Sequence, residues 1–235
     1  MASLVGSRVE RKEDKKLLTG RGKYTADVNF VNQTFAYFVR SPHARAQIKK
    51  VDTSKALKAS GVVAVLTGAD IANDKIGGLI AGWRIKSEDG SDMKVPAHPP
   101  LASDTVNYVG DHVAVVIAES LDEARNAAEL VKVDYKIMKA VVSTKDAMNS
   151  DQIYKEIPKN LCFDWLLGDR AKVKEAFDKA DKIIKIDLIN NRLVPNAMEP
   201  RAANADYNPS TEEITLYTTS QNPHLARIII SAFNG

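Results

Sequence analysis

The sequence has one cysteine, little net charge and no long hydrophobic run. The single residue Cys162 excludes an internal disulfide framework, and it excludes a zinc or iron–sulfur site built from several cysteines of this chain. The formal net charge is only +3, and no stretch interleaves Lys and Arg with aromatic residues, so nothing favours a nucleic-acid partner. Small molecules and other proteins remain as expected partners.

The hydrophobic runs are also short. The longest, Val62–Leu66 and Val113–Ala118, have the length of strands and fall far below the ~20 residues of a membrane helix. Met1–Lys16 contains no apolar region of signal-peptide length. We therefore expect no transmembrane segment, no secretion signal and a cytoplasmic location.

Several kinds of catalytic motif are absent. No Ser-His-Asp, Cys-His or HExxH arrangement can be found, and the four histidines are scattered, so hydrolase chemistry has no support. Gly20 and Gly22 follow no strand and lack a third glycine, which excludes a dinucleotide loop. His43 has no second ligand at a coordinating distance in the sequence, so we expect a structural histidine.

The first part of the chain alternates strand-like and helix-like patterns, which predicts two β–α–β units. Thr53 is expected to cap a helix that ends at Gly61, and Ser120 and Glu123 form a predicted capping box. Gly110 and Asp111 predict a hairpin turn. The expected strands are Thr34–Arg40, Val62–Leu66, Thr105–Tyr108, His112–Ala118 and Val131–Tyr135, and the expected helices are Ser54–Ser60 and a segment from Leu121 to Val131.

A length of 235 residues favours two domains. We expect a first α/β domain over residues 1–148 with a basic N-terminal arm, a polar linker over 149–160, and a second domain that starts over 161–235. Ala72–Pro100 predicts an irregular loop with a functional or interface role, with disorder as the alternative. In the second domain we expect a helix at Arg170–Ala180, a strand at Lys182–Leu188 and a hairpin of Ala202–Tyr207 with Glu213–Thr218.

The end of this hairpin is the strongest candidate site. A strand pattern stops at Thr219, and Asn222 and Pro223 suit the cap and first position of a helix that Gly235 would close. Gln221 would then lie between a strand end and the free N–H groups of a helix start, where a phosphate or an oxygen ligand can bind. The alternative is that Ser220–Pro223 is only a strand-to-helix turn.

Two motifs extend this observation. Met198-Glu199-Pro200-Arg201-Ala202, followed by Thr219-Ser220-Gln221-Asn222-Pro223-His224, resembles the molybdopterin-binding large subunit of the molybdenum hydroxylases, and within them the aerobic carbon monoxide dehydrogenases. The segments Thr19–Asp27 and Tyr108–Tyr135 are similar to the family's first domain. The resemblance implies an α/β (α+β) fold, in which a hammerhead-type α/β domain precedes the first part of a molybdopterin-binding α+β domain.

The resemblance also implies a function. The family hydroxylates substrates oxidatively at a molybdenum–molybdopterin centre, with the cytosine dinucleotide form expected here, and passes electrons to iron–sulfur clusters and FAD on partner subunits. Gln221 matches the glutamine that hydrogen-bonds an oxygen ligand of molybdenum, and Asn222, His224, Glu199 and Arg201 are further cofactor-binding candidates. Glu199 and Arg201 could instead form a buried structural pair.

The resemblance covers about the first third of the family's subunit. The segments that carry its general base and its diagnostic cysteine loop have no counterpart up to Gly235. We therefore expect a truncated large subunit, without cofactor or activity alone, whose partners are the iron–sulfur subunit, the flavin subunit and the rest of the large subunit in a dimeric complex. An aldehyde, xanthine or nitrogen-heterocycle dehydrogenase remains open, as does a non-catalytic assembly module.

Overall fold

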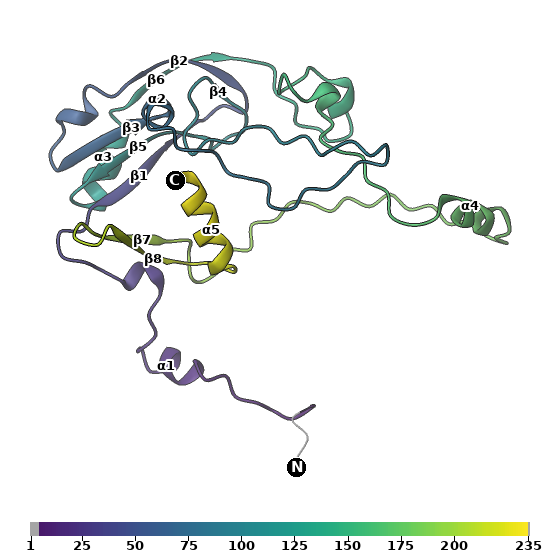
Figure 1. Cartoon of the computed structure of the whole chain (residues 1–235), viewed down its shortest axis with the longest axis horizontal. Helices are drawn as coiled ribbons and strands as arrows, with labels where there is room; N and C mark the ends of the chain where they lie inside the picture. The colour runs from purple at the N-terminus through teal and green to yellow at the C-terminus, as the bar shows by residue number, and fades with distance from the viewer. Residues whose placement is uncertain (1–4, 235) are drawn as a thin grey trace. The chain divides into compact units, whose positions relative to one another are not determined.

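The computed structural model describes residues 5–234. The chain divides into two compact units, Met1–Gln33 with Asn190–Pro223 and Thr34–Ile189 with His224–Gly235, and each is described by itself. The elements of both are drawn in Figure 1. Helices and small sheets are mixed throughout, which confirms the α/β (α+β) class. The predicted domain limits at 149–160 rest on composition and stay a prediction.

The larger unit contains two three-stranded sheets, and every strand pair in them is antiparallel. The first sheet has the order β1-β5-β3 and the second the order β4-β2-β6. The strands are β1 (Phe35–Arg40), β2 (Ala46–Asp52), β3 (Val62–Thr67), β4 (Thr105–Val106), β5 (His112–Ala118) and β6 (Lys132–Ile137).

This topology corrects two predictions. Strands β4 and β5 follow each other through Gly110 but lie in different sheets, so the predicted hairpin is wrong. The predicted β–α–β unit around α3 is wrong for the same reason, since β5 and β6 lie in different sheets. The strands of the other predicted unit, β1 and β3, share a sheet, but β5 lies between them. Spacing along the chain located the other strands of this unit but missed β2, and partner choice depends on long-range packing that the local pattern does not contain.

The central strand β5 is buried on both faces. Ala114 and Val116 contribute to one apolar cluster, and Val113 contributes to the other. The first cluster joins β5 to residues of α3 and β3, and the second joins it to the sheet that contains β2. Val51 and Val133, paired across β2 and β6, pack against both clusters and so connect the two halves of the core.

Helix α3 (Leu121–Ala128) lies against β1 and β5 (Figure 1). The Ser120 hydroxyl accepts the backbone N–H of Glu123, as predicted for the cap. The Glu123 carboxylate accepts from that same hydroxyl at 2.8 Å, so the reciprocal bond to the backbone, expected for a capping box, is replaced by a side-chain bond. The predicted helix Ser54–Ser60 is shorter than expected, a 3₁₀ turn at Ala56–Lys58 (η2) without a side-chain cap.

Four further segments of this unit differ in how well the sequence predicted them. Helix α2 (Gly68–Asn73) was not predicted, and the irregular segment that follows it agrees with the predicted loop up to residue 100. Helix α4 (Arg170–Asp178) was predicted, and Asp169 caps it by accepting the N–H groups of Ala171 and Lys172. The predicted strand Lys182–Leu188 is wrong, because no described residue pairs with it.

The segment 149–160 is polar, yet the larger unit holds it firmly. It lies between the 3₁₀ turns Ala147–Asn149 (η3) and Pro158–Asn160 (η4). The Asn160 side chain donates to the carbonyl oxygens of Ala147 and Asp151 and accepts the N–H of Ile153, and the Ile157 side chain is buried. Composition alone gave no sign of these bonds.

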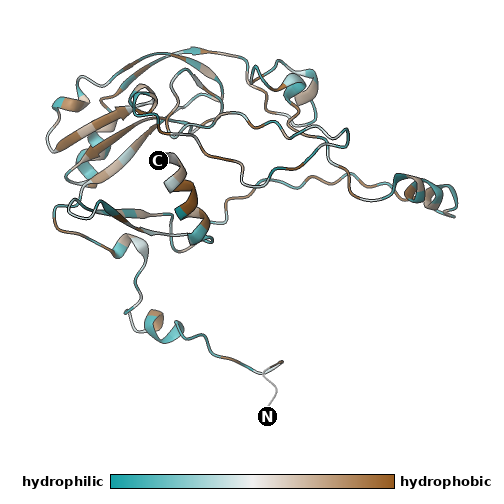
Figure 2. Cartoon of the chain, in the orientation of Figure 1, coloured by the Kyte–Doolittle hydropathy of each residue, from teal (hydrophilic) through white to brown (hydrophobic). Residues whose placement is uncertain are grey.

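The smaller unit contains the predicted hairpin, β7 (Ala203–Asn208) with β8 (Glu213–Thr218), together with α1 (Asp14–Leu18) and the 3₁₀ turn Thr25–Asp27 (η1). Helix α5 (Pro223–Asn234) begins at the predicted proline, and Figure 2 shows its middle as strongly hydrophobic. Gly235, expected to end α5, lies outside the described residues. Among the described helices, none has the length and hydropathy needed to cross a membrane.

Candidate functional site

The turn that carries Gln221 has the geometry predicted for it. Strand β8 ends at Thr218 and helix α5 begins at Pro223, so Gln221 lies between a strand end and a helix start. The Ser220 hydroxyl accepts the Asn222 N–H at 3.2 Å, which closes the turn. The Gln221 side chain is exposed, and within residues 5–234 its amide has no hydrogen-bond partner. Its donor and acceptor are therefore both free for a ligand.

The position of this turn is fixed by Ala202, which precedes β7. The Ala202 N–H donates to the Thr219 hydroxyl at 3.1 Å, and the Thr219 N–H donates to the Ala202 carbonyl at 3.3 Å. The Thr218 hydroxyl also donates to that carbonyl, at 3.3 Å. The Thr219 hydroxyl donates to the same carbonyl at 3.3 Å. Four bonds thus hold Thr218 and Thr219 against the end of the Met198–Ala202 motif, and they bring together the two motifs that were quoted from the sequence.

Glu199 has a partner that the sequence did not suggest. Its Oε1 accepts the backbone N–H of Thr25 at 3.1 Å and the Thr25 hydroxyl at 3.4 Å. No ion pair joins Glu199 to Arg201 in the described part of the chain, and Arg201 is exposed, so the alternative of a buried structural pair is wrong. The donors to this carboxylate come instead from Thr25, 174 residues earlier in the sequence.

The remaining candidates lie on exposed positions. Asn222 and His224 flank the first residue of α5, and both side chains are exposed. His224 belongs to the larger unit, so it is assigned no contact with the Gln221 turn. The predicted cofactor-binding roles of all five residues stay predictions.

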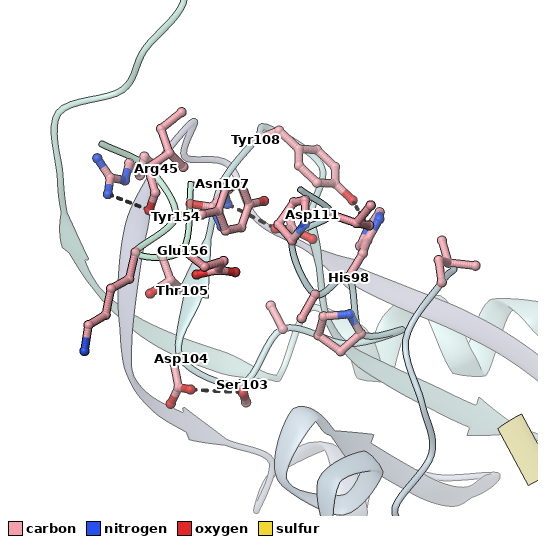
Figure 3. Close-up of a pocket in the computed structure, with 18 of the residues that line it drawn as sticks. Arg45, His98, Ser103, Asp104, Thr105, Asn107, Tyr108, Asp111, Tyr154 and Glu156 are labelled. Atoms are coloured by element: carbon pink, nitrogen blue, oxygen red, sulfur yellow. Dashed lines mark hydrogen bonds between the residues drawn. The ribbon is translucent and has the colours of Figure 1, made fainter. Parts of the chain in front are cut away.

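The larger unit has an open cavity of about 880 Å³ that includes none of these five residues (Figure 3). Asp111 accepts the Asn107 N–H at 3.1 Å, and His98 Nε2 lies 3.3 Å from the Tyr108 hydroxyl. Burial, followed by the nearby Asp111 carboxylate, raises the pKa of Tyr108 and of Tyr154. Both phenols therefore stay protonated near neutral pH and can donate hydrogen bonds.

Arg45 shapes this cavity, and sequence reasoning gave it no role. Its guanidinium donates to the carbonyl oxygens of Lys139, Gln152 and Ile153 at 3.2–3.3 Å, while its buried Nε has no partner. Figure 3 shows Arg45 turned toward the chain segment that follows β6. Its hydrogen bonds go to backbone oxygens of residues 139–153, so Arg45 links this segment to the start of β2. A lone basic residue in a loop gives no signal for such a role.

Metal binding by side chains alone has no support in the described chain. Within residues 5–234, no three His, Cys, Asp or Glu side chains lie close enough together to hold a metal ion. His43 packs edge-on against Tyr135, with ring centroids 4.9 Å apart, which agrees with the structural role expected for it. Any metal at the Gln221 turn would have to bring its own ligands.

Two family models match the chain. Residues 19–139 match the a/b hammerhead domain of aldehyde oxidase and xanthine dehydrogenase, and residues 153–235 match the molybdopterin cofactor-binding domain. The first match contains both sheets of the larger unit, and the second contains the Gln221 turn.

Individual proteins agree with these models. The large subunit of nicotine 6-hydroxylase from Paenarthrobacter nicotinovorans is 35% identical over 99% of this chain, and the carbon monoxide dehydrogenase large chain of Afipia carboxidovorans is 32% identical over 98%. The structure of reconstituted CO dehydrogenase from Oligotropha carboxidovorans matches 98% of the chain with a TM-score of 0.84 and 31% identity.

The chain spans only 28% and 29% of the lengths of the two relatives, and 29% of the solved chain. Within that span the agreement is continuous, since it includes both matched domains and nearly every residue of the chain. The chain therefore belongs to the molybdenum hydroxylase family of aldehyde oxidase and xanthine dehydrogenase, and corresponds to the hammerhead domain and the first part of the molybdopterin-binding domain of its large subunit.

Proposed function

We propose that this chain serves oxidative hydroxylation at a molybdenum–molybdopterin centre, and that Gln221 is its contact with an oxygen ligand of that centre. The observation that carries the proposal is the free amide of Gln221 on a turn fixed by the Ala202–Thr219 bonds, inside the part of the chain that matches a molybdopterin cofactor-binding domain. A free donor at a fixed point is what an oxygen ligand requires.

The residues present fit such a group. The Gln221 amide can donate to an oxygen atom and can also accept a hydrogen bond from a bound group. The exposed Asn222 side chain offers a further donor in the same turn. The bound cofactor would supply the oxygen-transfer and electron-accepting chemistry, while this turn would orient one oxygen by hydrogen bonding.

The other cofactors and partners belong to the same proposal. We propose the cytosine dinucleotide form of the pterin, iron–sulfur clusters and FAD on partner subunits, and a dimeric complex with the rest of the large subunit. The names of the relatives support a multi-subunit assembly, since they include a large subunit, a large chain and a subunit gamma. The described residues offer neither a cysteine cluster nor a general base in the turn, so these functions would come from elsewhere in the complex.

Carbon monoxide is the first candidate substrate, as the resemblance implied. Hydroxylation of a nitrogen heterocycle is the second, and the 35% identity to a nicotine 6-hydroxylase large subunit favours it. A third possibility, a non-catalytic module, would bind no cofactor in the complex. Dye-linked oxidation assays on the assembled complex, with carbon monoxide, nicotine, an aldehyde and a purine, separate these candidates when run beside molybdenum analysis.

The Gln221 contact is tested by Gln221→Ala in the complete complex. Removing one hydrogen-bond donor from an oxygen ligand in an active site lowers turnover by about 10²-fold. Folding stability should change little, because an exposed turn side chain contributes little packing. Gln221→Glu keeps the size and loses the donor, so it should lose turnover as well. If either variant keeps full turnover per molybdenum, Gln221 has only a turn role.

The isolated chain of 235 residues provides a simpler test. We expect it to hold no molybdenum and to show no turnover, because one free amide is far less than the many contacts that grip a pterin cofactor. Stoichiometric molybdenum in the purified chain, with oxidation of any of the four substrates, would contradict this expectation.

A further inference from the structure

Two side chains near the Gln221 turn hold a segment of the N-terminal arm from opposite sides. Glu199 Oε1 accepts the Thr25 N–H at 3.1 Å and the Thr25 hydroxyl at 3.4 Å. Asn204 Nδ2 donates to the carbonyl oxygens of Thr25 at 3.1 Å and of Val28 at 2.7 Å. An acceptor thus meets the donors of the 3₁₀ turn Thr25–Asp27, and a donor meets its carbonyl groups.

This complementarity makes the contact specific. All four bonds are partly buried, and Thr25 lies 174 residues before Glu199 and 179 before Asn204. A carboxylate at position 204 could not donate to these carbonyl oxygens, and a cation at position 199 could not accept from Thr25, so the contact depends on the side chains present. The Phe30 ring adds a second contact, with its centroid 5.5 Å from that of Tyr217 in β8.

The held positions lie on either side of Ala202. Glu199 precedes Ala202 by three residues and Asn204 follows it by two. Ala202 is the residue whose N–H and carbonyl both bond to Thr219, two residues before Gln221. Hydrogen bonds that join Thr25 and Val28 to residues 199 and 204, and Ala202 to Thr218 and Thr219, therefore meet on one short backbone segment within the smaller unit.

We propose that Thr25, with Glu199 and Asn204, forms a latch by which the N-terminal arm holds the Gln221 turn in place, so that Glu199 and Asn204 are positioning residues for Gln221. The segment around Thr25 then supports the cofactor-binding end of the chain, although it lies within residues 19–139, which match the hammerhead domain. The structural half of this inference stands on the contacts alone, and its catalytic half rests on the proposed role of Gln221.

The latch can be opened without disturbing the backbone. Thr25→Pro removes both donors to Glu199, and proline suits Thr25 because this residue is the first of a 3₁₀ turn. The preceding Tyr24 is extended, with φ −94° and ψ 166°, which is the conformation favoured before proline. Thr25→Ser keeps both donors and is the matched control. Asn204→Ala opens the other side of the latch.

Amide hydrogen exchange in the full chain tests the structural half. The Thr219 N–H, bonded to Ala202, should exchange about tenfold faster in Thr25→Pro and in Asn204→Ala, as expected for the loss of one or two modest hydrogen bonds. Thr25→Ser should exchange as the unchanged chain does. The Val116 amide in β5 is the internal reference, since it belongs to the other unit.

Unchanged Thr219 exchange, with faster exchange at residues 24–28, would overturn the latch, because the arm would then have loosened without releasing the turn. If exchange of the Val116 amide is also faster in Thr25→Pro, that variant has unfolded more widely. The exchange rates of Thr219 and Val116 in Asn204→Ala are then compared instead. Equal acceleration of Val116 and Thr219 in both variants counts against the latch.

The catalytic half is tested in the complete complex. Thr25→Pro should lower kcat about tenfold with little change in KM, Thr25→Ser should restore it, and adding Thr25→Pro to Gln221→Ala should cost little more. Fully additive losses would overturn the positioning role. If Gln221→Ala leaves turnover intact, the proposed function fails, whereas the exchange of Thr219 still decides whether the latch exists.

Discussion

Residues 41–157 and residues 161–234 use their apolar side chains in opposite ways. Every buried side chain of the described chain lies between Ser41 and Ile157. After Ile157 no described side chain is buried, although this part is also rich in isoleucine, leucine and valine. The first region therefore completes a core by itself, whereas the second presents an apolar surface that its own residues do not cover.

The segment 182–198 shows what this difference means. Ile184 and Leu188 are 89% and 83% exposed, and Val194 and Met198 are 79% and 89% exposed. The pattern Lys182–Leu188 has strand character, yet no described strand pairs with it. A strand sequence becomes a strand only when a partner offers its backbone groups. The segment Lys182–Leu188 thus has β-strand propensity but no partner strand among the described residues.

Limited trypsin digestion should show the largest difference between the two regions. Lys182, Lys185 and Arg192 are exposed, and residues 181–198 make no backbone hydrogen bond to any described residue. Cleavage there needs almost no local opening, whereas cleavage in β5 needs loss of the core, so the rates should differ by about 10³-fold or more. Mass spectrometry of the first fragments checks this.

The expected cleavage sites differ from those that the composition of the sequence suggests. Composition pointed to Ala72–Pro100 and Asn149–Asn160, but Asn160, Arg45 and buried Ile157 hold the second stretch in place. First cuts within Val113–Tyr135 would contradict both the domain assignment and the comparison drawn here. First cuts within 149–160 would show that its hydrogen bonds open easily.

Much of the fold could be predicted from the sequence because it depends on local sequence signals. The apolar run Val113–Ala118, the cap at Ser120 and the hairpin of β7 and β8 each depend on neighbours in sequence. Sheet membership was not readable, because a strand such as β4 pairs with β2 rather than with adjacent β5 through long-range packing. Periodicity identifies a strand and its faces, but it does not identify the partner.

The candidate site divides in the same way. The turn at Gln221 was predicted from a proline and a change of pattern, both of which are local. The contact of Glu199 with Thr25 was missed, because residues 174 apart give no periodic signal, and Arg201 was the charged neighbour in sequence. A carboxylate that binds backbone N–H groups leaves no trace in a charge pattern.

A matched pair of leucine substitutions measures the comparison directly. Leu101 is 2% exposed and Leu188 is 83% exposed. Leu101→Ala should lower the free energy of unfolding by about 2–5 kcal/mol, because it removes buried apolar atoms and leaves a cavity. Leu188→Ala should change it by no more than about 0.5 kcal/mol.

Urea denaturation of the full chain, followed by tryptophan fluorescence and circular dichroism together, gives both values. Equal losses from the two substitutions would mean that Leu188 is covered in solution, for instance by another copy of the chain. Repeating the Leu188→Ala measurement at tenfold lower protein concentration separates that case, since a loss caused by association depends on concentration.

The smallest expected effect concerns His112 in β5, whose ring stacks on Phe38 with centroids 4.5 Å apart. Burial, and secondarily the positive charge of Arg40, lowers the pKa of His112 below its ordinary value of 6.5. The folded state therefore binds the proton less well than the unfolded state does. Stability should be constant above about pH 7 and should decline as the pH falls below 6.5 toward the lowered pKa.

The measurement is the melting temperature of the chain between pH 7.5 and about pH 5, compared with that of His112→Gln, which cannot titrate in this range. The chain should lose stability on acidification, and His112→Gln should lose less. Because His112 is only partly buried, the difference should be small. The same slope in both proteins would mean that other groups cause the loss. In that case protonation of carboxylates would explain the loss, and the burial of His112 would have no consequence for stability.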